Sequence, residues 1–293
     1  MGKRKAAADA QTPSKDKMDI DGEEEDSDED IDLLNVDFEW FDPQPAVDFH
    51  GLKTLLRQLL DIDNQLFDLS ELSDMILAQP LLGSTVKCEG NESDPYAFLT
   101  VLNMHSHRDK NVIKQLTKYL LERSKSADEN LHAQLQKLLS PDSDAQVGLI
   151  LTERFINMPH QIVPPMYNML LEEIQWALND KEPYQFSHYL VISKTYTEVA
   201  SKLDAEDNPP AKKSKAKEAK PEVFYFHPED EVLHKHALGW ADYDFEKLSE
   251  EGASDAKRAF QELGVKSQGH LILMEGKRFE GAVKAVGEYL SGE

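Results

Sequence analysis

Two pairs of histidines separated by one residue are the first candidates for chemistry in this sequence. His105 and His107 form one pair, and His234 and His236 form the other. In a strand, residues two apart point to the same face, so either pair could present two imidazoles to a metal ion. A zinc site needs further ligands, and no acid or histidine stands at a recognisable spacing from either pair. We interpret all four as surface or loop histidines and expect no metal site.

Other reactive groups are few. Cys88 is the single cysteine, which excludes an intramolecular disulfide and a cysteine-rich zinc site and indicates a reducing compartment, cytosol or nucleus. It lies in a predicted strand, where a lone thiol is typically a small buried apolar group. The motifs GxGxxG, GxxxxGK(S/T), HExxH and GxSxG are absent from the sequence. We therefore expect no catalytic residue and no cofactor.

The charge balance is the strongest signal of the whole composition. The chain of 293 residues carries a formal net charge of −23. Nucleic-acid binding driven by charge needs a basic surface, so we expect no direct nucleic-acid partner. No apolar run is long enough to span a bilayer, so we expect no membrane insertion. A strongly negative potential favours a basic protein as the partner.

Part of this charge lies at the start of the chain. Residues 1–35 are predicted to be a disordered acidic tail, because they contain almost nothing apolar to bury. Ser27, which is followed by acids, resembles the target of an acidophilic kinase. The tail acids that we expect to contact a basic partner are Glu23, Glu24, Glu25, Asp26, Asp28, Glu29 and Asp30.

A basic cluster interrupts the acidic sequence late in the chain. Residues 204–221 contain only alanine as apolar content and are predicted to be a disordered loop between two paired strands. A lysine cluster on an exposed loop is typical of a nuclear import signal, which fits the acidic groove of an import receptor. The lysines of this candidate signal are Lys212, Lys213, Lys215 and Lys217. Residues 3–5 form a second, shorter basic cluster.

Hydrophobic patterns predict the elements that position these groups. Residues 147–151 form a continuous apolar run, which is typical of a strand buried on both faces, and residues 166–178 have the spacing of an amphipathic helix. Further strands are predicted at 36–41, 84–88, 96–102, 186–199, 223–226 and 270–274, and further helices at 52–60, 69–77, 111–122, 130–139 and 279–290. Residues 237–243 read either as a strand or as a turn-rich segment. This pattern predicts a single α/β domain at 36–293, with a mixed central sheet flanked by helices.

Two further expectations concern side chains on these elements. Trp40, Trp176 and Trp240 are predicted to pack in the core. The polar stretch 153–161, between the buried strand and its helix, is the candidate partner-facing loop, with Glu153 as its acidic contact.

Four stretches of this sequence resemble one known family. They are VDFEWFDP at 36–43, QPLLGSTVK at 79–87, DPYAFLTVLN at 94–103 and ILTERFINMPHQIVPPMY at 150–167. Together they resemble the BCCIP family of nuclear proteins, whose fungal members are called Bcp proteins. The match extends from about residue 36 to the C-terminal helix, and the last two stretches are the most specific.

The resemblance implies a fold similar to GNAT-type acetyltransferases and a role that is not enzymatic. That role is to chaperone a basic large-subunit ribosomal protein, number fourteen in the universal scheme and twenty-three in yeast usage. The chaperone would take this protein into the nucleus, with the help of an import receptor, and onto the pre-60S particle. Fungal members are also linked to nuclear export of a phosphatidylinositol-4-phosphate 5-kinase, which is the alternative function. We therefore expect nuclear localisation with shuttling to the cytoplasm.

An acetyltransferase is the third alternative, and the sequence argues against it. Such enzymes hold the acetyl-CoA pyrophosphate on a (Q/R)xxGx(G/A) turn at a helix N-terminus. No two of the fourteen glycines lie two residues apart. The Gly-x-Ala variant occurs only at Gly239–Ala241, where His236 replaces the required Gln or Arg. The sequence therefore predicts an acetyltransferase-like scaffold without a cofactor site.

Overall fold

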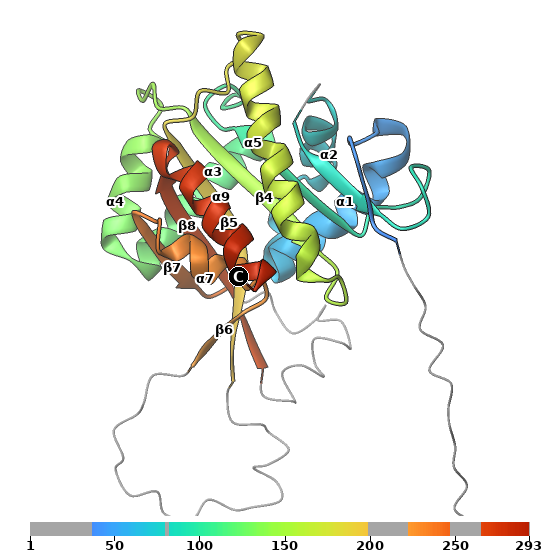
Figure 1. Ribbon diagram of the computed structural model, residues 1–293. Helices are drawn as coiled ribbons and strands as arrows, with labels where there is room; N and C mark the ends of the chain where they lie inside the picture. The colour runs from blue at the N-terminus through green and yellow to red at the C-terminus, as the bar shows by residue number, and fades with distance from the viewer. Residues whose placement is uncertain (1–36, 80–81, 199–221, 247–264, 293) are drawn as a thin grey trace, which may run out of the picture. The chain divides into compact units, whose positions relative to one another are not determined.

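One mixed sheet connects the N-terminal and C-terminal parts of the chain. The computed structural model describes residues 37–79, 82–198, 222–246 and 265–292. The sheet has eight strands in the order β1-β2-β3-β4-β5-β8-β7, and β6 pairs with the far end of β5 (Figure 1). The strands are β1 (Glu39–Phe41), β2 (Ser84–Lys87), β3 (Ala97–Asn103), β4 (Val147–Arg154), β5 (His188–Glu198), β6 (Val223–Tyr225), β7 (Gly239–Tyr243) and β8 (Val265–Glu275). Only β4 and β5 run parallel; every other pair among these strands is antiparallel.

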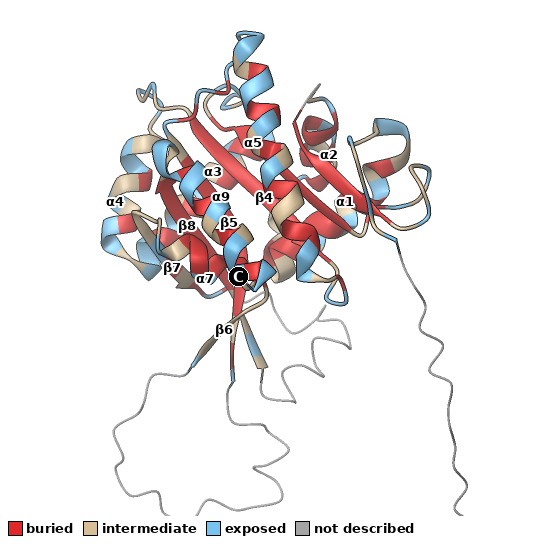
Figure 2. Cartoon of the chain, in the orientation of Figure 1, coloured by how far each residue is buried: buried red, intermediate tan, exposed pale blue. Residues whose placement is uncertain are grey.

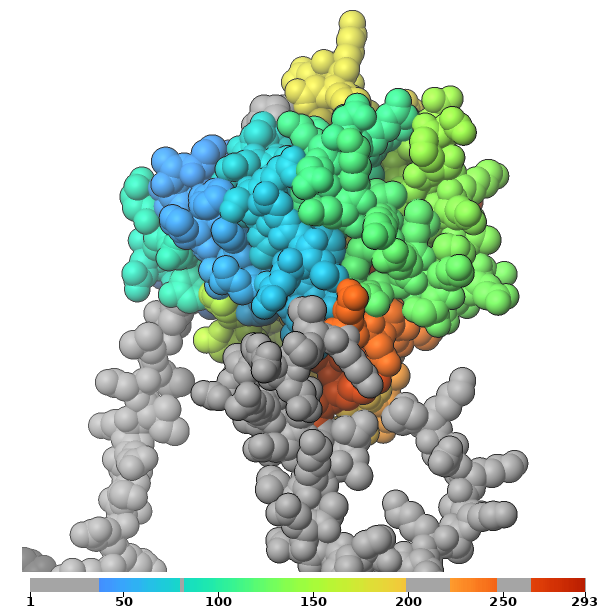
Figure 3. Space-filling view, turned by 180° about the vertical axis from the view of Figure 1, so that it is seen from behind, coloured from blue at the N-terminus to red at the C-terminus, as the bar shows by residue number. Residues whose placement is uncertain are grey.

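Helices cover both faces of the sheet. One face packs against α1 (Pro45–Leu60), α2 (Leu69–Leu77), α3 (Asn111–Ala127) and α4 (Glu129–Leu138), which fill the view from behind in Figure 3. The other face packs against α5 (Val163–Asn179), α7 (Glu229–His234) and α9 (Gly276–Ser291), which lie in front in Figure 1. Two 3-10 turns, η1 (Asp61–Leu66) and η2 (His160–Ile162), complete the elements. No helix in the described ranges is long and apolar enough to cross a membrane.

The predicted buried strand lies at the centre of this sandwich. Leu149 and Leu151 of β4 point into the core beneath α1–α4, whereas Ile150 points into the core beneath α5 and α9. Successive side chains of a strand alternate between faces, so a strand covered on both sides must be apolar throughout. The expectation of a mixed sheet flanked by helices is confirmed.

The structure corrects the sequence prediction at two places near this strand. The predicted strand 147–151 is longer in the structure, because β4 continues through the polar residues 152–154 and pairs with β3 as far as Arg154. The two buried charged side chains here are tolerated because Glu153 is bound by Lys194 and His227 and Arg154 is bound by Glu229. Helix α7, at Glu229–His234, was not predicted, because six residues carry too little periodicity to indicate a helix.

The two strands that flank the lysine-rich segment in the sequence, β5 and β6, pair with each other. Thr195, Tyr196 and Thr197 of β5 pair antiparallel with β6. The candidate import lysines of residues 204–221 and the acidic tail of residues 1–35 lie outside the described residues.

A buried ion pair joins the first helix to the second strand. Lys87 Nζ of β2 lies 2.7 Å from Asp48 Oδ1 of α1, and neither side chain is exposed to solvent. The ammonium group also donates to the backbone oxygen of Asn91 at 2.6 Å, and the Gln44 amide donates to Asp48 Oδ2 at 2.7 Å. Full hydrogen bonding is what makes a buried pair of charges tolerable.

Removal of one member of this pair should destabilise the protein strongly. We expect Lys87→Met to lower the free energy of unfolding by about 3–5 kcal/mol, because it leaves the Asp48 carboxylate buried without its cation. The double variant Lys87→Met/Asp48→Leu should recover a large part of the loss. Urea denaturation of the wild type, both single variants and the double variant checks this. Additive losses in the double variant would contradict it.

Candidate functional site: a sealed charge cluster and an acidic surface

The two parallel strands separate at one end, and a histidine fills the gap. The pairing of β4 and β5 stops at Leu151 and Ile192, although both strands continue. His227, in the turn between β6 and α7, lies between the separated ends. Its Nε2 is 3.1 Å from Glu153 Oε1 on β4, and its Nδ1 is 3.2 Å from Ser193 Oγ on β5. The imidazole therefore bridges strands that no longer share backbone hydrogen bonds.

A lysine completes the partners of Glu153. Lys194 Nζ lies 2.7 Å from Glu153 Oε2 and donates to the backbone oxygen of Gln58 in α1 at 2.8 Å. Desolvation opposes ionisation of Glu153, but the charges of His227 and Lys194 outweigh it and lower its pKa to about 2. The carboxylate is thus ionised at every physiological pH. Through Lys194 it connects β4 and β5 to α1.

A second set of charges surrounds the first on the side of α7. Arg154 forms a two-point contact with Glu229, with nitrogen–oxygen distances of 2.6 and 3.0 Å. Ser193 Oγ donates to Asp230 Oδ2 at 2.5 Å. Burial raises the pKa of the Asp230 carboxyl to about 6; His227 opposes this rise, and the neighbouring Glu229 adds to it. We refer to Glu153, Arg154, Ser193, Lys194, His227, Glu229 and Asp230 as the charge cluster.

The cluster contains a serine, a histidine and an acid in the arrangement found in serine hydrolases, but here these side chains have a structural role. Ser193, His227 and Glu153 follow one another as nucleophile, base and orienting acid would. All three are at most 2% exposed, so no substrate can reach the hydroxyl. The Ser193 hydroxyl also donates to Asp230 rather than to the imidazole. These contacts hold the strands together and leave no reacting atom accessible.

The helix that follows β4 has an unusual start. Val163, Pro164 and Pro165 occupy its first three positions. The first turn of a helix normally offers free N–H groups that bind phosphate. The two prolines have no N–H, so this helix start lacks two of the donors that a pyrophosphate would need.

A second histidine group lies beside β7 and β8. His234 Nε2 is 2.7 Å from His270 Nε2, and His270 Nδ1 is 2.7 Å from Asp242 Oδ1. Desolvation and the neighbouring His270 lower the pKa of His234 to about 4. His234 thus pairs with His270 from a distant strand and not with His236. Within the described ranges no group of three or more ligating side chains could hold a metal ion.

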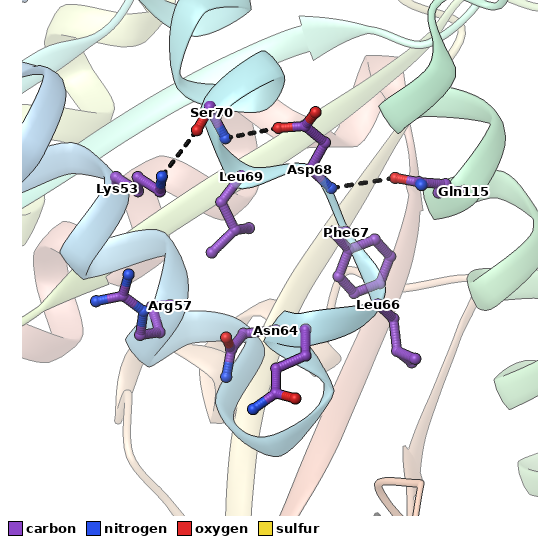
Figure 4. A pocket seen from close by; sticks show the side chains of 10 residues that line it. Lys53, Arg57, Asn64, Leu66, Phe67, Asp68, Leu69, Ser70 and Gln115 are labelled. Carbon is purple, nitrogen blue, oxygen red and sulfur yellow. Dashed lines mark hydrogen bonds between the residues drawn. The ribbon is translucent and has the colours of Figure 1, made fainter.

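A shallow depression of about 480 Å³ lies between α1, α2 and α3 (Figure 4). Lys53 Nζ donates to Ser70 Oγ at 2.8 Å, and the Ser70 amide donates to Asp68 Oδ1 at 3.0 Å. The Asp68 amide in turn donates to Gln115 Oε1 at 3.2 Å. These polar groups bond to one another and join the three helices, and we assign no ligand to the depression.

Acidic side chains gather where the sheet begins. The exposed acids on and beside β1 and in the turn between β2 and β3 are Asp37, Glu39, Asp42, Glu89, Glu92 and Asp94. We call this set the acidic edge. Its neighbouring base, Lys87, is buried and already paired with Asp48. The edge therefore presents uncompensated negative charge to solvent.

The structure places the predicted site residues as follows. Glu153 was predicted to contact a partner, and this is corrected: it is 2% exposed and bound to Lys194 and His227. The loop after it does reach the surface, where Ile156 is 87% exposed. Ser27, the seven tail acids and the four loop lysines lie outside the described part of the chain.

The three tryptophans do not all pack in the core, as the sequence suggested. Trp40 is half-buried against the core beneath α5, but Trp176 and Trp240 are 54% and 44% exposed. Cys88 is half-buried, and its free thiol has a pKa raised by burial and by Glu89. The charge cluster itself was missed, because its histidine, its serine and its second acid are dispersed in the sequence. The one available signal was the polar triplet 152–154 directly after a buried strand.

Comparisons with known proteins give a consistent result. The BCCIP family model matches residues 33–233. Protein bcp1 of Aspergillus fumigatus is 58% identical over 295 residues, which cover 99% of each chain. Protein bcp1 of Schizosaccharomyces pombe is 53% identical over 263 residues, covering 89% of this chain and 92% of the relative. The crystal structure of BCP1 from Saccharomyces cerevisiae has a TM-score of 0.60 at 29% identity and covers 92% of this chain and 93% of that one.

The raised pKa of Asp230 predicts a pH-dependent stability. Because this carboxyl holds its proton up to about pH 6 in the folded state but only to about 3.8 when unfolded, it stabilises the fold at low pH. That stabilisation is lost as the pH rises towards 6, by up to about 1.4 kcal/mol per pH unit. Asp230→Asn should remove this slope, because an amide cannot ionise but still accepts the Ser193 hydroxyl.

Denaturant unfolding of the wild type and of Asp230→Asn between pH 4.5 and 6.5 tests the prediction. In this window Glu153 stays ionised in the folded state, because its pKa is about 2. Asp109→Asn, a change of an exposed acid, is the matched control and should leave the wild-type slope in place. If the difference in stability between the wild type and Asp230→Asn were constant with pH, the assignment would be refuted.

Proposed function

This chain belongs to the BCCIP family, and on that premise we propose that it is an acidic nuclear chaperone for a basic large-subunit ribosomal protein. The client is the protein numbered fourteen in the universal scheme and twenty-three in yeast usage. The chaperone escorts this client into the nucleus and onto the pre-60S particle. It acts by binding and release, with no chemical step.

The observation that carries this proposal is the excess of acid on the surface of the folded part. The described residues contain 34 acidic and 18 basic side chains, a net charge of −16. The three buried bases, Lys87, Arg154 and Lys194, are each paired with a buried acid. In total six acids and three bases are buried, so 28 acids and 15 bases remain outside the core. The folded domain attracts cations without help from the tail.

Such a surface suits a client that binds RNA. Carboxylates on the chaperone neutralise the basic RNA-binding face of the client and prevent its adhesion to unrelated RNA. Exposed ion pairs contribute only about 0–1 kcal/mol each and are screened by salt, so charge mainly accelerates association. Selectivity requires a contact that is shape-matched and apolar as well.

The acidic tail should affect the rate of association more than the affinity. We expect the full-length variant with Glu23, Glu24, Glu25, Asp26, Asp28, Glu29 and Asp30 changed to amides to bind the purified client more slowly, by roughly ten-fold at low ionic strength. The difference should vanish near 0.5 M salt, because the Debye length is then only a few ångströms.

Stopped-flow association at several salt concentrations measures this effect. The chaperone proposal itself fails if the wild type does not bind the purified client, or if binding is indifferent to salt. A complete loss of binding in the tail variant would show that the tail, and not the folded domain, holds the client.

The lysine cluster between β5 and β6 is proposed to be the nuclear import signal. Changing Lys212, Lys213, Lys215 and Lys217 to alanine removes the cations that an import receptor's acidic groove would bind. We expect a fluorescent fusion of this variant to accumulate in the cytoplasm, whereas a variant with alanines at residues 3–5 stays mainly nuclear. Unchanged nuclear accumulation of the first variant would contradict this assignment.

We also propose that the fold is related to that of GNAT-type acetyltransferases. It is supported by the unit β4–α5–β5, in which a loop leads from a strand to a helix start, the place where such enzymes hold pyrophosphate. Here Pro164 and Pro165 remove two N–H donors from that helix start, and His227 fills the gap between the strands. These features argue for a scaffold that has no acetyl-transfer function.

Nuclear export of a phosphatidylinositol-4-phosphate 5-kinase is the alternative that the family resemblance implies. It remains a prediction that could coexist with the chaperone role. No feature of the residues in the structure favours a lipid kinase over a basic ribosomal protein as the partner, so we place the chaperone role first.

A further inference from the structure

The outer face of α5 carries a tryptophan with no aromatic partner. Trp176 is 54% exposed, and none of the ring contacts of the described residues involves it. Trp240 differs, because its ring stacks on His234 with a centroid distance of 4.3 Å. Tryptophan is enriched among the residues that anchor protein interfaces, and an exposed ring that stacks on no other ring is free to contact a partner.

The residues around Trp176 form one polar stripe that contains no base. The exposed positions of α5 recur at helical spacing and are Asn168, Glu172, Gln175, Trp176 and Asn179. Helix α5 contains no Lys, Arg or His anywhere along its 17 residues, whereas α1, α3 and α9, which are of similar length, each contain at least two. Figure 2 shows this outward side of α5 open to solvent.

A buried carboxyl group, Glu173, connects this stripe to the sheet. Glu173, next to Glu172, accepts from the Gly83 amide at 2.8 Å and is buried against the start of β2. Burial raises the pKa of Glu173, and the charges of Asp42 and Glu172 raise it further. Ser84 Oγ also donates to Glu173 Oε1 at 3.4 Å, and the next residue of β2, Thr85, pairs with Phe41, which directly precedes Asp42. Asp42 therefore follows the strand that pairs with the Glu173-bound start of β2, and it links the stripe to the acidic edge.

We propose that this surface, made of the α5 stripe and Asp42, is where the basic client docks. The inference rests on the proposed chaperone function and adds the place of binding. The face of the Trp176 ring contacts a lysine or arginine of the client, or the apolar residues next to that cation. Glu172 and Asp42 pair with further cations of the client. The tryptophan supplies the apolar anchor that the charged surface alone lacks.

The charge of the α5 surface favours a basic client over a second copy of the chain or a nucleic acid. A second copy of the chain would bring the same base-free stripe against itself, and like charges would repel. A nucleic acid would meet carboxylates rather than cations. The depression beside α1 carries Lys53 and Arg57, and α9 carries Lys277, Arg278 and Lys284, so both surfaces suit a basic client less well.

Two substitutions test the docking surface. We expect Trp176→Ala in the full chain to weaken binding of the purified ribosomal protein by roughly 30-fold or more, as loss of a central anchor does. Glu172→Lys should also weaken it, and more strongly at low salt, because it places a cation within the stripe. Tyr289→Ala is the matched control: Tyr289 is 47% exposed on α9, and its loss should leave the affinity unchanged.

Isothermal titration of the wild type and the three variants gives these affinities, with thermal unfolding as a check that the exposed changes leave the fold intact. Loss of binding in Trp176→Ala and Glu172→Lys, with normal binding in Tyr289→Ala, supports the inference. If the wild type binds and both α5 variants bind equally well, the inference is wrong while the chaperone function stands. If the wild type itself does not bind the purified ribosomal protein, both the docking surface and the chaperone function are refuted.

Discussion

The separation of β4 from β5 is the constraint on which much of this structure depends. Where two parallel strands part, the space between them must be filled, and the polar side chains that reach into it need partners. His227 does this by reaching Glu153 on one strand and Ser193 on the other. The charges that accompany it, Lys194 and Asp230, follow from the same need, because a buried ion is tolerated only with partners.

The way in which His227 and its partners fill the gap limits what can bind between the two strands. Side chains occupy the gap in the sheet, and the nearby helix begins with prolines in place of N–H donors. The gap is therefore a sealed structural cluster, with Glu153, Ser193 and His227 at most 2% exposed. The fold and the function are therefore separate questions, and the function must be sought on the surface.

The pairing of buried charges also shapes that surface. Lys87, Arg154 and Lys194 each enter the core together with an acid, so the described surface keeps most of the excess of carboxylates. The acidic edge contributes six exposed acids, and α5 adds Glu172 without any base. In the proposed complex, long-range charge would bring the basic client close, and Trp176 would then make the contact specific. These two effects act at different distances, which is why both are required.

The sequence by itself determined the main elements and the family, whereas the basic partner that its charge indicates stays a prediction. Periodicity predicted the strands at 96–102 and 147–151, which the structure shows at 97–103 and 147–154, because the spacing of apolar residues directly reflects burial on one or two faces. Net charge, which needs no coordinates, indicated a basic partner. The resemblance to the BCCIP family, carried by residues such as 150–167, is confirmed by the comparisons.

Only the tertiary structure decided which polar residues are buried and which aromatic residues are exposed. Glu153 looked like a loop acid, but His227 and Lys194, 74 and 41 residues further along the chain, neutralise it in the core. Trp176 looked like a core residue, but it lies on the outer face of α5 and is more than half exposed. Burial depends on contacts between residues distant in the chain, and the local spacing that reveals a helix or strand does not contain those contacts.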